Sequence, residues 1–594
     1  MTTASTRSPR RRTVVVLAVI VVVMFAFVVR LVDIQVVNAN EHVQDSLALG
    51  IGAQSTLYGT RGSIVDANGN VLAGSVMQYD AQLDPSNVGS IQTKDASGTA
   101  TDVTWPELAA QIGAITGQSA DEVQKVVSDA LATNPESKYA PLAKALSTEQ
   151  YRALDALGIP FLYFTSHPAR TYPDGAVAGN LVGFVGSDNQ PLEGLESSQD
   201  SCLAATDGSV VYQRGKDGNI IPGTEQERAA VDGGTVQLTI DRDLQYYLQQ
   251  LIAQGVHDMG ANFGTVTVVE VKTGKIRAAA EYPSVDPNDV GATGADDRSS
   301  RIFRSTFEPG STFKALTAST LIDAGGQSLS STAQVPSRIS FPNGATVTDA
   351  ASHPLYDYTL AGVLIDSSNV GASVFSERVS PQTRYDYLQK FGVGSGSSVA
   401  FPGEASGTVH PVSDWDNQML YDTSYGQGLT TTIPELLDAY DGVINDGVRV
   451  PLSLVESCTA PDGTVTTPDT PAPTRVISSD TSAQMRQILE NVALQGSVAD
   501  EAAVPGYRIG LKTGTGQKSD GNGGYKAGVY YTTLIGFAPA DDPQYLIAVT
   551  LDEPTAVRSS AANAPTFQKA MTQVLKTYRV MPSTSQPVVL PKTG

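Results

Sequence analysis

Cysteine and histidine are scarce in this sequence of 594 residues, which contains two cysteines and five histidines. Cys202 and Cys458 are too far apart for a CxxC site and too few for a disulfide framework, and the sequence leaves open whether they form one bridge in an oxidising compartment. The histidines show neither an HExxH motif nor the spacing of paired metal ligands. We therefore expect no metal and no other cofactor.

Basic residues are also fewer than acidic residues. The 61 acidic and 39 basic residues give a formal net charge of −22, which repels nucleic acid, so we expect no nucleic-acid partner. The sequence also lacks a phosphate-binding loop and a GxSxG turn. Only 17% of the residues are charged and 41% are hydrophobic, which is typical of globular folds, and a chain of this length divides into two or three domains.

One long apolar run follows four arginines near the start of the sequence. It covers residues 13–29 without a charge and continues past Arg30. As a helix the run spans roughly 25 Å, and snorkelling of Arg30 extends it across a bilayer. It is longer than the core of a cleavable signal peptide and no small-x-small site precedes Asn38, which favours an uncleaved anchor. The arginines predict a cytoplasmic tail over 1–12 and a transmembrane anchor over 13–35, with the rest of the chain outside.

Residues 36–230 change character often and show no periodic repeat. Residues 62–74 are typical of short strands joined by an Asn-Gly turn. Residues 105–117 predict a helix with an early proline and a terminal glycine. This mixture predicts an elongated α+β pedestal rather than an enzyme core.

A second domain is expected over residues 231–580. It opens with an alternating strand, a helix capped by Asp241 and a hairpin over 264–283 with a Thr-Gly turn. Several helices follow, and three strands and a closing helix come last, over 508–516, 530–540, 544–554 and 565–576. Strands at both ends of the domain predict that its first and last parts share one sheet. The Pro- and Ser-rich residues 581–594 predict a disordered tail.

The stretch EPGSTFKALTAS, residues 308–319, places Ser311 and Lys314 three residues apart at the start of a predicted helix. Side chains at this spacing share one helix face, and backbone N–H groups at a helix start can hold an oxyanion. Ser311 is thus a candidate nucleophile with Lys314 as its base. Because an ordinary lysine is almost fully charged at pH 7, Lys314 has to be buried or crowded by another cation. Ser-x-x-Lys alone recurs by chance, so this chemistry requires a second lysine.

Two later stretches supply candidate partners. Ser367 and Asn369, in a predicted helical region, offer a hydroxyl that can relay a proton and a carboxamide that can hold an ammonium, although such pairs are also common helix caps. The stretch LKTGTG lies in a predicted strand. It offers a positive charge, two hydroxyls that can grip a carboxylate and a backbone open to substrate, on Lys512, Thr513, Thr515 and Gly514.

Lys-Thr-Gly occurs three times, at 272–274, 512–514 and 592–594. The first copy is the natural turn of the predicted hairpin, and the third lies in the predicted tail. Only the copy at 512 lies in an apolar strand after both other stretches. We therefore interpret the other two as coincidence.

Together the three stretches resemble the Ser-x-x-Lys, Ser-x-Asn and Lys-Thr-Gly motifs of penicillin-binding proteins and serine β-lactamases. Further blocks look like those of class B penicillin-binding proteins, at 61–73, 170–186, 192–196, 424–436 and 536–549. One anchor, a pedestal and a single transpeptidase domain resemble the division-specific branch. The resemblance implies an α+β fold: an N-terminal transmembrane helix, an elongated dimerisation-like pedestal, and a penicillin-binding or serine β-lactamase-like domain with an antiparallel sheet flanked by helices and an all-helical subdomain.

The resemblance also implies a reaction. Ser311 would attack the D-Ala-D-Ala carbonyl of a peptidoglycan stem peptide while Lys314 takes its proton. Ser367 would pass a proton to the departing D-Ala, and Asn369 would orient Lys314 and the substrate amide. The donor carboxylate would be bound by Lys512, Thr513 and Thr515, and backbone N–H groups of Ser311 and Thr515 would form the oxyanion hole. An amine of a neighbouring stem peptide then takes the acyl group, and β-lactam antibiotics acylate Ser311 because they imitate the donor.

The same resemblance implies a single-pass protein of the bacterial cell membrane with its catalytic domain outside, working with a polytopic glycan-strand polymerase and other division proteins. Four alternatives stay open. An elongation-type transpeptidase and a D,D-carboxypeptidase would use the same residues. A serine β-lactamase would need a water-activating base and has no use for an anchor and a pedestal. A non-catalytic scaffold of a wall-building complex would carry the motifs as relics.

Two positions depart from the family pattern. Gly516 stands where alanine is usual, and Asn180 stands where histidine is common. The closing residues LPKTG resemble a sortase recognition motif, but no apolar stretch or basic tail follows them and the predicted anchor already tethers the chain. We interpret this match as chance.

Overall fold

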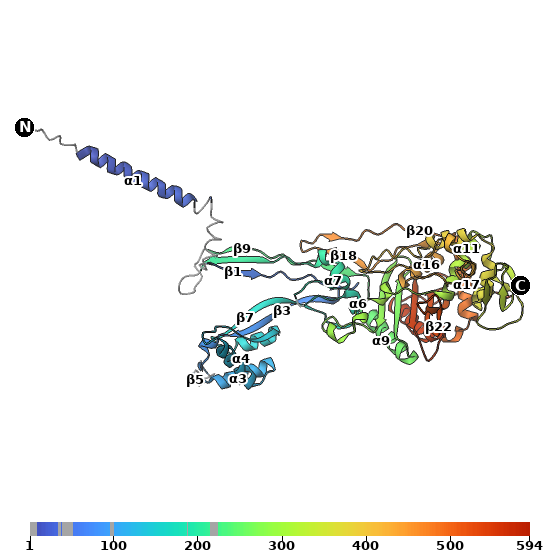
Figure 1. Cartoon of the computed structure of the whole chain (residues 1–594), viewed down its shortest axis with the longest axis horizontal. Helices are drawn as coiled ribbons and strands as arrows, with labels where there is room; N and C mark the ends of the chain where they lie inside the picture. Colours follow the sequence, from blue (N-terminus) through green and yellow to red (C-terminus); the bar gives the residue numbers. More distant parts are fainter. Residues whose placement is uncertain (1–8, 34–36, 38–51, 95–99, 187, 214–223) are drawn as a thin grey trace, which may run out of the picture. The chain divides into compact units, whose positions relative to one another are not determined.

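The computed structural model describes residues 9–33, 37, 52–94, 100–186, 188–213 and 224–594. Helix α1, Pro9–Val32, drawn in dark blue in Figure 1, contains the apolar run. Within the described ranges it is the one helix long and apolar enough to cross a membrane, over Thr13–Val32. Residues 1–8 of the predicted cytoplasmic tail and 34–35 of the predicted anchor lie outside the described residues.

The chain divides into two compact units, residues 1–60 with 205–232 and residues 61–204 with 233–594. The first unit contains an antiparallel three-stranded sheet in the order β1-β8-β9. Its strands are β1 (Gly52–Leu57), β8 (Gly208–Gln213) and β9 (Gln226–Arg228). The residues predicted to form the pedestal therefore belong to both units.

A lobe of the second unit is built around the long strand β3. This strand pairs antiparallel with β7 and β6, and helices α3, α4 and α5 help to enclose a separate hydrophobic core. Helix α3 ends at Gly117 as predicted, where a φ of 80° favours glycine. The elements are β3 (Val71–Leu83), β4 (Ile91–Lys94), β5 (Ala100–Val103), α3 (Trp105–Thr116), α4 (Ala120–Thr133), β6 (Ala140–Leu146), α5 (Thr148–Asp155) and β7 (Leu162–Thr171).

The sheet of this lobe continues into the predicted enzyme domain. Its strand order is β19-β18-β10-β2-β3-β6, with β7 also paired to β3. Cys202 of α8 and Cys458 of β18 form a disulfide, which settles the question that the sequence left open. The additional elements are β2 (Ile64–Val65), α8 (Asp200–Leu203), β10 (Thr235–Leu238), β18 (Val455–Thr459) and β19 (Val465–Thr466).

A buried carboxylate unites the first three sequence blocks. Glu196 accepts hydrogen bonds from Nε of Arg61 at 2.8 Å and from Nε of Arg170 at 2.6 Å. Arg170 also donates to the carbonyl of Gly62 at 2.6 Å. Because a buried charge that loses its partner is strongly destabilising, this cluster gives the three blocks a structural role. Two short helices lie nearby in the sequence, α6 (Gly179–Val182) and α7 (Gly194–Ser198).

The predicted enzyme domain contains a five-stranded antiparallel sheet in the order β12-β11-β23-β22-β21. The first two strands come from the start of the domain and the others from its end, as predicted. Helix α9 is capped by Asp241, also as predicted, and packs with α19 against the sheet. The elements are α9 (Arg242–Met259), β11 (Phe263–Glu270), β12 (Lys275–Tyr282), β21 (Gly510–Ser519), β22 (Tyr525–Ala538), β23 (Tyr545–Asp552) and α19 (Ala564–Thr577).

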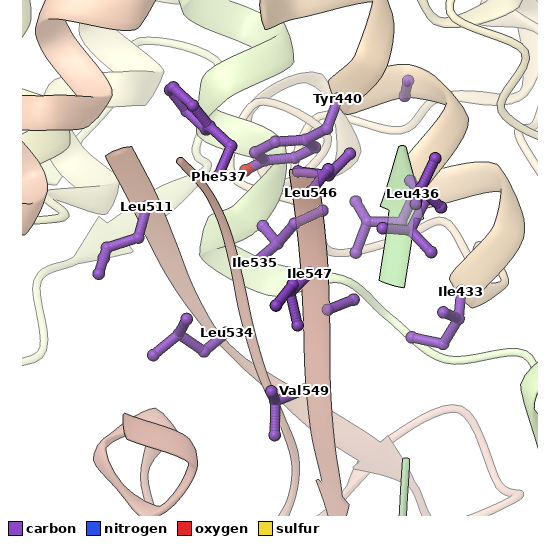
Figure 2. Packing of buried hydrophobic residues seen from close by; sticks show 14 of the residues in the cluster. Ile433, Leu436, Tyr440, Leu511, Leu534, Ile535, Phe537, Leu546, Ile547 and Val549 are labelled. Carbon is purple, nitrogen blue, oxygen red and sulfur yellow. The ribbon is translucent and has the colours of Figure 1, made fainter. Parts of the chain in front are cut away.

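Helix α16 and the strands share the apolar core shown in Figure 2. Leu436 and Tyr440 of α16 (Ile433–Ile444) belong to it together with Leu546 of β23. The hydroxyl of Tyr440 donates a 2.7 Å hydrogen bond to the carbonyl of Thr312. The core is thereby joined directly to the turn that carries Ser311.

Helices fill most of the chain between the two groups of sheet strands. The predicted all-helical subdomain is not purely helical, however, because three small strand pairs lie in this described stretch, β13 with β16, β14 with β15 and β17 with β20. The helices are α10 (Arg301–Arg304), α11 (Lys314–Asp323), α12 (Leu360–Ile365), α13 (Asn369–Ser376), α14 (Pro381–Lys390), α15 (Met419–Asp422), α16, α17 (Ser479–Gln495) and α18 (Ala499–Ala502). The short strands are β13 (Thr332–Val335), β14 (Arg338–Ser340), β15 (Thr346–Thr348), β16 (Tyr356–Thr359), β17 (Val448–Arg449) and β20 (Thr474–Arg475).

Residues 581–594 differ from the predicted disordered tail. They form neither a helix nor a strand ladder, yet they pack on the domain. Leu590 is buried, and its backbone N–H donates to Oδ1 of Asn491 at 2.8 Å. Proline and serine content predicted disorder because such residues build no core of their own, but the partners of this segment lie elsewhere in the chain.

Candidate active site

Ser311 and Lys314 lie at a helix start, as predicted. Ser311 is in the 3-10 turn η5 (Gly310–Phe313), and Lys314 is the first residue of α11. Lys314 Nζ lies 2.7 Å from Ser311 Oγ. Ser311 is partly exposed whereas Lys314 is buried. The hydroxyl is therefore accessible to a substrate, while the amine is shielded from water.

The turn before Ser311 requires glycine at two positions. Gly310 has a φ of 55°, and a Cβ there would lie 2.9 Å from the carbonyl oxygen of Thr515. Gly426 has a φ of 86°, and a Cβ there would lie 2.2 Å from the carbonyl oxygen of Gly310. The N–H of Gly310 donates to the carbonyl of Gly426 at 2.9 Å. The block at 424–436 thus holds the turn that carries Ser311 in place.

The neighbours of Lys314 Nζ determine where its lone pair points. Nζ donates to the carbonyl of Ser367 at 2.7 Å and to Oδ1 of Asn369 at 2.6 Å. A neutral amine has two N–H groups, so these acceptors use both and leave the lone pair for the Ser311 hydroxyl. Burial, reinforced by the charge of Lys512, lowers the pKa of Lys314 well below its usual range. Lys314 is therefore suited to act as a base near neutral pH.

Lys512, on β21, is the second lysine that the sequence required. Its Nζ donates to Ser367 Oγ at 2.9 Å and to the carbonyl of Thr513 at 3.1 Å. Burial lowers the pKa of Lys512 to about 7. Ser367 Oγ also lies 3.4 Å from Lys314 Nζ, so one hydroxyl bridges the two amines.

The Ser367-Ser368-Asn369 stretch connects α12 to α13 rather than lying inside one helix. Ser367 has a φ of 58°, a left-handed conformation that is uncommon for serine. Ser368 caps α13 by accepting from the N–H of Gly371 at 2.8 Å, and its hydroxyl donates to Asp349 Oδ2 at 2.7 Å. This stretch therefore serves both as a helix cap, through Ser368, and as part of the candidate site, because Ser367 and Asn369 contact Lys314.

A cavity of about 940 Å³ opens in front of these groups. The predicted site residues that line it are Ser311, Ser367, Asn369, Thr513, Gly514 and Thr515. Gly514 also has a packing role, because a Cβ there would lie 2.6 Å from the carbonyl oxygen of Pro309. The glycine thus allows η5 to pack on β21, which brings Ser311 to the strand that carries Lys512.

Comparison with known proteins identifies the family. Residues 56–238 match the penicillin-binding protein dimerisation domain, and residues 264–572 match the penicillin binding protein transpeptidase domain. The penicillin-binding protein PbpB of Mycolicibacterium smegmatis is 36% identical over 566 residues, which covers 90% of this chain and 85% of that relative. This chain belongs to the penicillin-binding protein transpeptidase family. It is a class B penicillin-binding protein of the division type.

A solved structure and a second relative agree with this assignment. Penicillin-binding protein 3 from Mycobacterium tuberculosis, complexed with aztreonam, matches with a TM-score of 0.69 and 31% identity over 91% of this chain and all of that chain. The peptidoglycan D,D-transpeptidase FtsI of Escherichia coli is 29% identical, with 88% of this chain and 84% of the relative covered. This penicillin-binding protein therefore shares the two-domain fold of its relatives as well as their motifs.

Sequence reasoning missed Asp349 and His353, which support the site from behind Ser368. Asp349 Oδ1 accepts from the N–H of Val370 at 2.9 Å, and its Oδ2 lies 2.9 Å from His353 Nε2. Although burial opposes it, the hydrogen bond to Asp349 raises the pKa of His353. The two residues lie in a polar loop without a motif, and only the fold brings that loop to α13, so no local pattern indicates them.

The other copies of Lys-Thr-Gly do not line the cavity. In the first copy, Gly274 has a φ of 68° and ends the turn of the β11–β12 hairpin, while Lys272 donates to Oδ1 of Asn445 at 3.1 Å. In the third copy, Lys592 pairs with Asp366. The departure at Asn180 is structural, since its buried carboxamide donates to the carbonyl of Asp297 at 2.7 Å.

Proposed function

We propose that this penicillin-binding protein cross-links peptidoglycan stem peptides as a D,D-transpeptidase through an acyl-enzyme on Ser311. The carrying observation is that three motifs far apart in the sequence meet at one cavity, where the lone pair of Lys314 is left for the Ser311 hydroxyl. The family of the chain, whose relatives include named peptidoglycan D,D-transpeptidases, supports the same reaction.

In the acylation step, Ser311 Oγ forms a bond to the carbonyl carbon between the two D-Ala residues of the donor. The proton of the hydroxyl passes to Lys314 Nζ, 2.7 Å away. Negative charge develops on the carbonyl oxygen, which the backbone N–H groups of Ser311 and Thr515 are proposed to stabilise, each by about 3 kcal/mol. The short turn η5 places one of these donors at the nucleophile itself.

The leaving step breaks the amide C–N bond, and the departing D-Ala needs a proton on its nitrogen. Ser367 Oγ is proposed to supply it, because this hydroxyl lies between the two lysine amines. The proton taken by Lys314 then replaces the one that Ser367 gives away. Asn369 holds Lys314 in place, and the acceptor amine later attacks the acyl-enzyme by the reverse path.

The donor's terminal carboxylate is proposed to bind at β21. Lys512 provides the positive charge, and the hydroxyls of Thr513 and Thr515 provide hydrogen bonds. A bound carboxylate favours the charged form of Lys512, which offsets the effect of its burial. β-Lactams carry a carboxylate at the matching position and would be held by the same groups.

A long-lived acyl-enzyme distinguishes this function from that of a β-lactamase, which must activate water. The carboxylates that line the cavity, among the described residues, are Asp349 and Asp366. Asp349 is engaged by Ser368 and Val370, and Asp366 by Tyr358. Neither forms a hydrogen bond with Ser311 in the described structure, so rapid deacylation by either carboxylate is not expected.

The cellular setting is also part of the proposal. The four arginines before the apolar run favour a cytoplasmic start and an extracytoplasmic catalytic domain, and the disulfide fits an oxidising compartment. We further propose a polytopic glycan-strand polymerase and other division proteins as partners, on the strength of the division-type relatives. Fluorescent fusions should gather at the septum, and depletion should give filaments; a uniform side-wall signal would favour the elongation alternative.

Fluorescent penicillin tests the nucleophile. The full chain in detergent should form one stable adduct that peptide mapping places on Ser311, and Ser311→Ala should form none. Incubation with donor and acceptor strands should release D-Ala and give dimers. D-Ala release without dimers would indicate a carboxypeptidase, rapid β-lactam turnover a β-lactamase, and growth supported by Ser311→Ala a scaffold.

A further inference from the structure

The segment 580–594, here called the strap, lies in a site that is built for it. Asn491 of α17 is fully buried, and its Oδ1 accepts from the N–H of Leu590 at 2.8 Å while its Nδ2 donates to the carbonyl of Val588 at 2.9 Å. Within α17 the same Nδ2 also donates to the carbonyl of Gln487 and the same Oδ1 accepts from Nε2 of Gln495, so the strap fills the remaining hydrogen-bonding capacity of a buried carboxamide. Gln495 adds a third bond, to the carbonyl of Leu590 at 3.0 Å.

Farther along, the strap runs beside β16 through a single β-bridge and crosses α12. Thr593 pairs antiparallel with Tyr358, and the N–H of Thr359 donates to the carbonyl of Lys592 at 3.0 Å. A Cβ at Gly362 would lie 1.9 Å from that same carbonyl oxygen. A larger residue at position 362 of α12 would therefore collide with the strap.

The side chain of Lys592 connects the strap to Asp366, the residue before Ser367. Lys592 Nζ lies 2.6 Å from Asp366 Oδ1, and the hydroxyl of Tyr358 donates to Asp366 Oδ2 at 2.8 Å. Ser367 itself has the left-handed φ of 58°. Such a conformation in a residue other than glycine persists only when its surroundings fix it. After Ser367 in the chain, Ser368 is fixed by its hydrogen bond to Asp349. Before it, Asp366 is fixed by its contacts with Lys592 and Tyr358.

We infer that the strap positions Ser367 for proton transfer, with Lys592 as its positioning residue acting through Asp366. The inference rests on the proposed function, because it assigns the strap a part in acylation. The LPKTG residues, interpreted above as a chance match to a sorting motif, then have a role within the fold. The strap touches no reacting group, so its loss should weaken acylation without abolishing it.

Three variants of the full chain test this role: Lys592→Ala, Lys592→Arg and, as a matched control, Lys576→Ala. Lys576 is an exposed lysine on α19. Stopped-flow acylation with fluorescent penicillin separates initial binding from the acylation rate constant. We expect Lys592→Ala to lower the rate constant about two- to fivefold with binding unchanged, Arg to restore it, and the control to match the parent.

A double-mutant cycle with Asp366→Asn identifies the path of the effect. The two changes together should slow acylation no more than the larger single change, because they remove one shared contact. Fully additive effects would overturn the inference, as would a parent rate in Lys592→Ala. A slower rate that follows a lower Tm and is not rescued by arginine would show a merely structural strap.

Acylation of the unmutated parent protein distinguishes a failure of this inference from a failure of the proposed function. If the parent forms no Ser311 adduct, the proposed function fails. If the parent is acylated and Lys592→Ala is acylated equally fast, the strap inference fails while the function stands.

Discussion

Two copies of Lys-Thr-Gly approach neighbouring residues of the same turn from different surroundings. Lys512 is fully buried on β21 and bonds Ser367, whereas Lys592 lies on the strap with its side chain 34% exposed and pairs with Asp366. Burial shifts the pKa of Lys512 to about 7. Lys592 keeps contact with water and forms an ion pair of the kind common at surfaces. The same tripeptide thus contains a candidate catalytic lysine where it is buried and a lysine that forms a structural ion pair where it is partly exposed.

The largest effect is expected from Lys512→Met. Acylation should slow by about 100- to 1000-fold, because a positive charge beside the donor carboxylate and Ser367 is lost. The same change should raise Tm at pH 7, since methionine removes an amine that burial disfavours in its charged form. The gain in Tm should shrink as pH rises toward about 10.4, where the unfolded lysine also loses its proton. Acylation kinetics and thermal unfolding measure both; unchanged acylation would remove Lys512 from the site.

The pH dependence of acylation gives the next largest effect. The rate should fall on the acid side as Lys314 becomes protonated and can no longer accept a proton. It should fall on the alkaline side above about pH 7, where free Lys512 loses its charge, with limbs of about tenfold per unit. Lys512→Met should remove the alkaline limb, while Lys592→Ala should lower the curve without moving it. A pH-independent rate between 5 and 10 would contradict the assignment of both lysines.

A smaller effect is expected from Gly362→Ala, which acts on the strap without changing its charge. The added methyl would displace the carbonyl of Lys592 and loosen its hold on Asp366. We expect acylation about threefold slower and a lower Tm, with little further loss when Lys592→Ala is added. Gly344→Ala is a control in the same domain, since a Cβ there has no neighbour within 4 Å, although its φ of 91° adds local strain.

The smallest effect on acylation is expected from replacing both cysteines by serine. The bridge closes a loop of more than 250 residues, and its removal should lower stability by about 2–5 kcal/mol. Neither cysteine lines the cavity, so the rate per folded molecule should not change. Denaturant unfolding and acylation at 20 °C measure the two quantities. A parallel loss of both would mean that acylation follows stability in general, which would weaken the comparison of the two lysines.

Local chemistry made much of this fold predictable. The cap at Asp241, the end of α3 at Gly117 and the turn at Gly274 were all indicated by residue types that suit those backbone conformations. The shared sheet followed from the order of strands along the chain. The candidate site was predictable because Lys314 can act as a base for Ser311 only if its pKa is lowered. That requirement pointed to a second lysine far away in the sequence.

Features that depend on distant partners were not predictable. Asp349 supports the candidate site because its loop packs against the start of α13, where it accepts hydrogen bonds from Ser368 and Val370. Nothing near Asp349 in the sequence predicts this contact. The strap has the composition of a flexible tail, but Asn491 and Gly362 on two separate helices provide its place. The segment 205–232 joins residues 52–60 in a separate unit, a pairing set by long-range strand contacts rather than by local pattern.

The order of strands in the central sheet also bears on how the enzyme is made. Thr265 of β11 pairs with Thr550 of β23, so a strand that leaves the ribosome early waits for one translated much later. Ser311 and Lys314 are synthesised about 200 residues before Lys512, and Ser367 connects Lys314 to Lys512 only after that wait. A nascent chain that has not yet reached β21 consequently lacks the second lysine of the candidate site, and we expect it to react with acyl donors only after Lys512 has been translated.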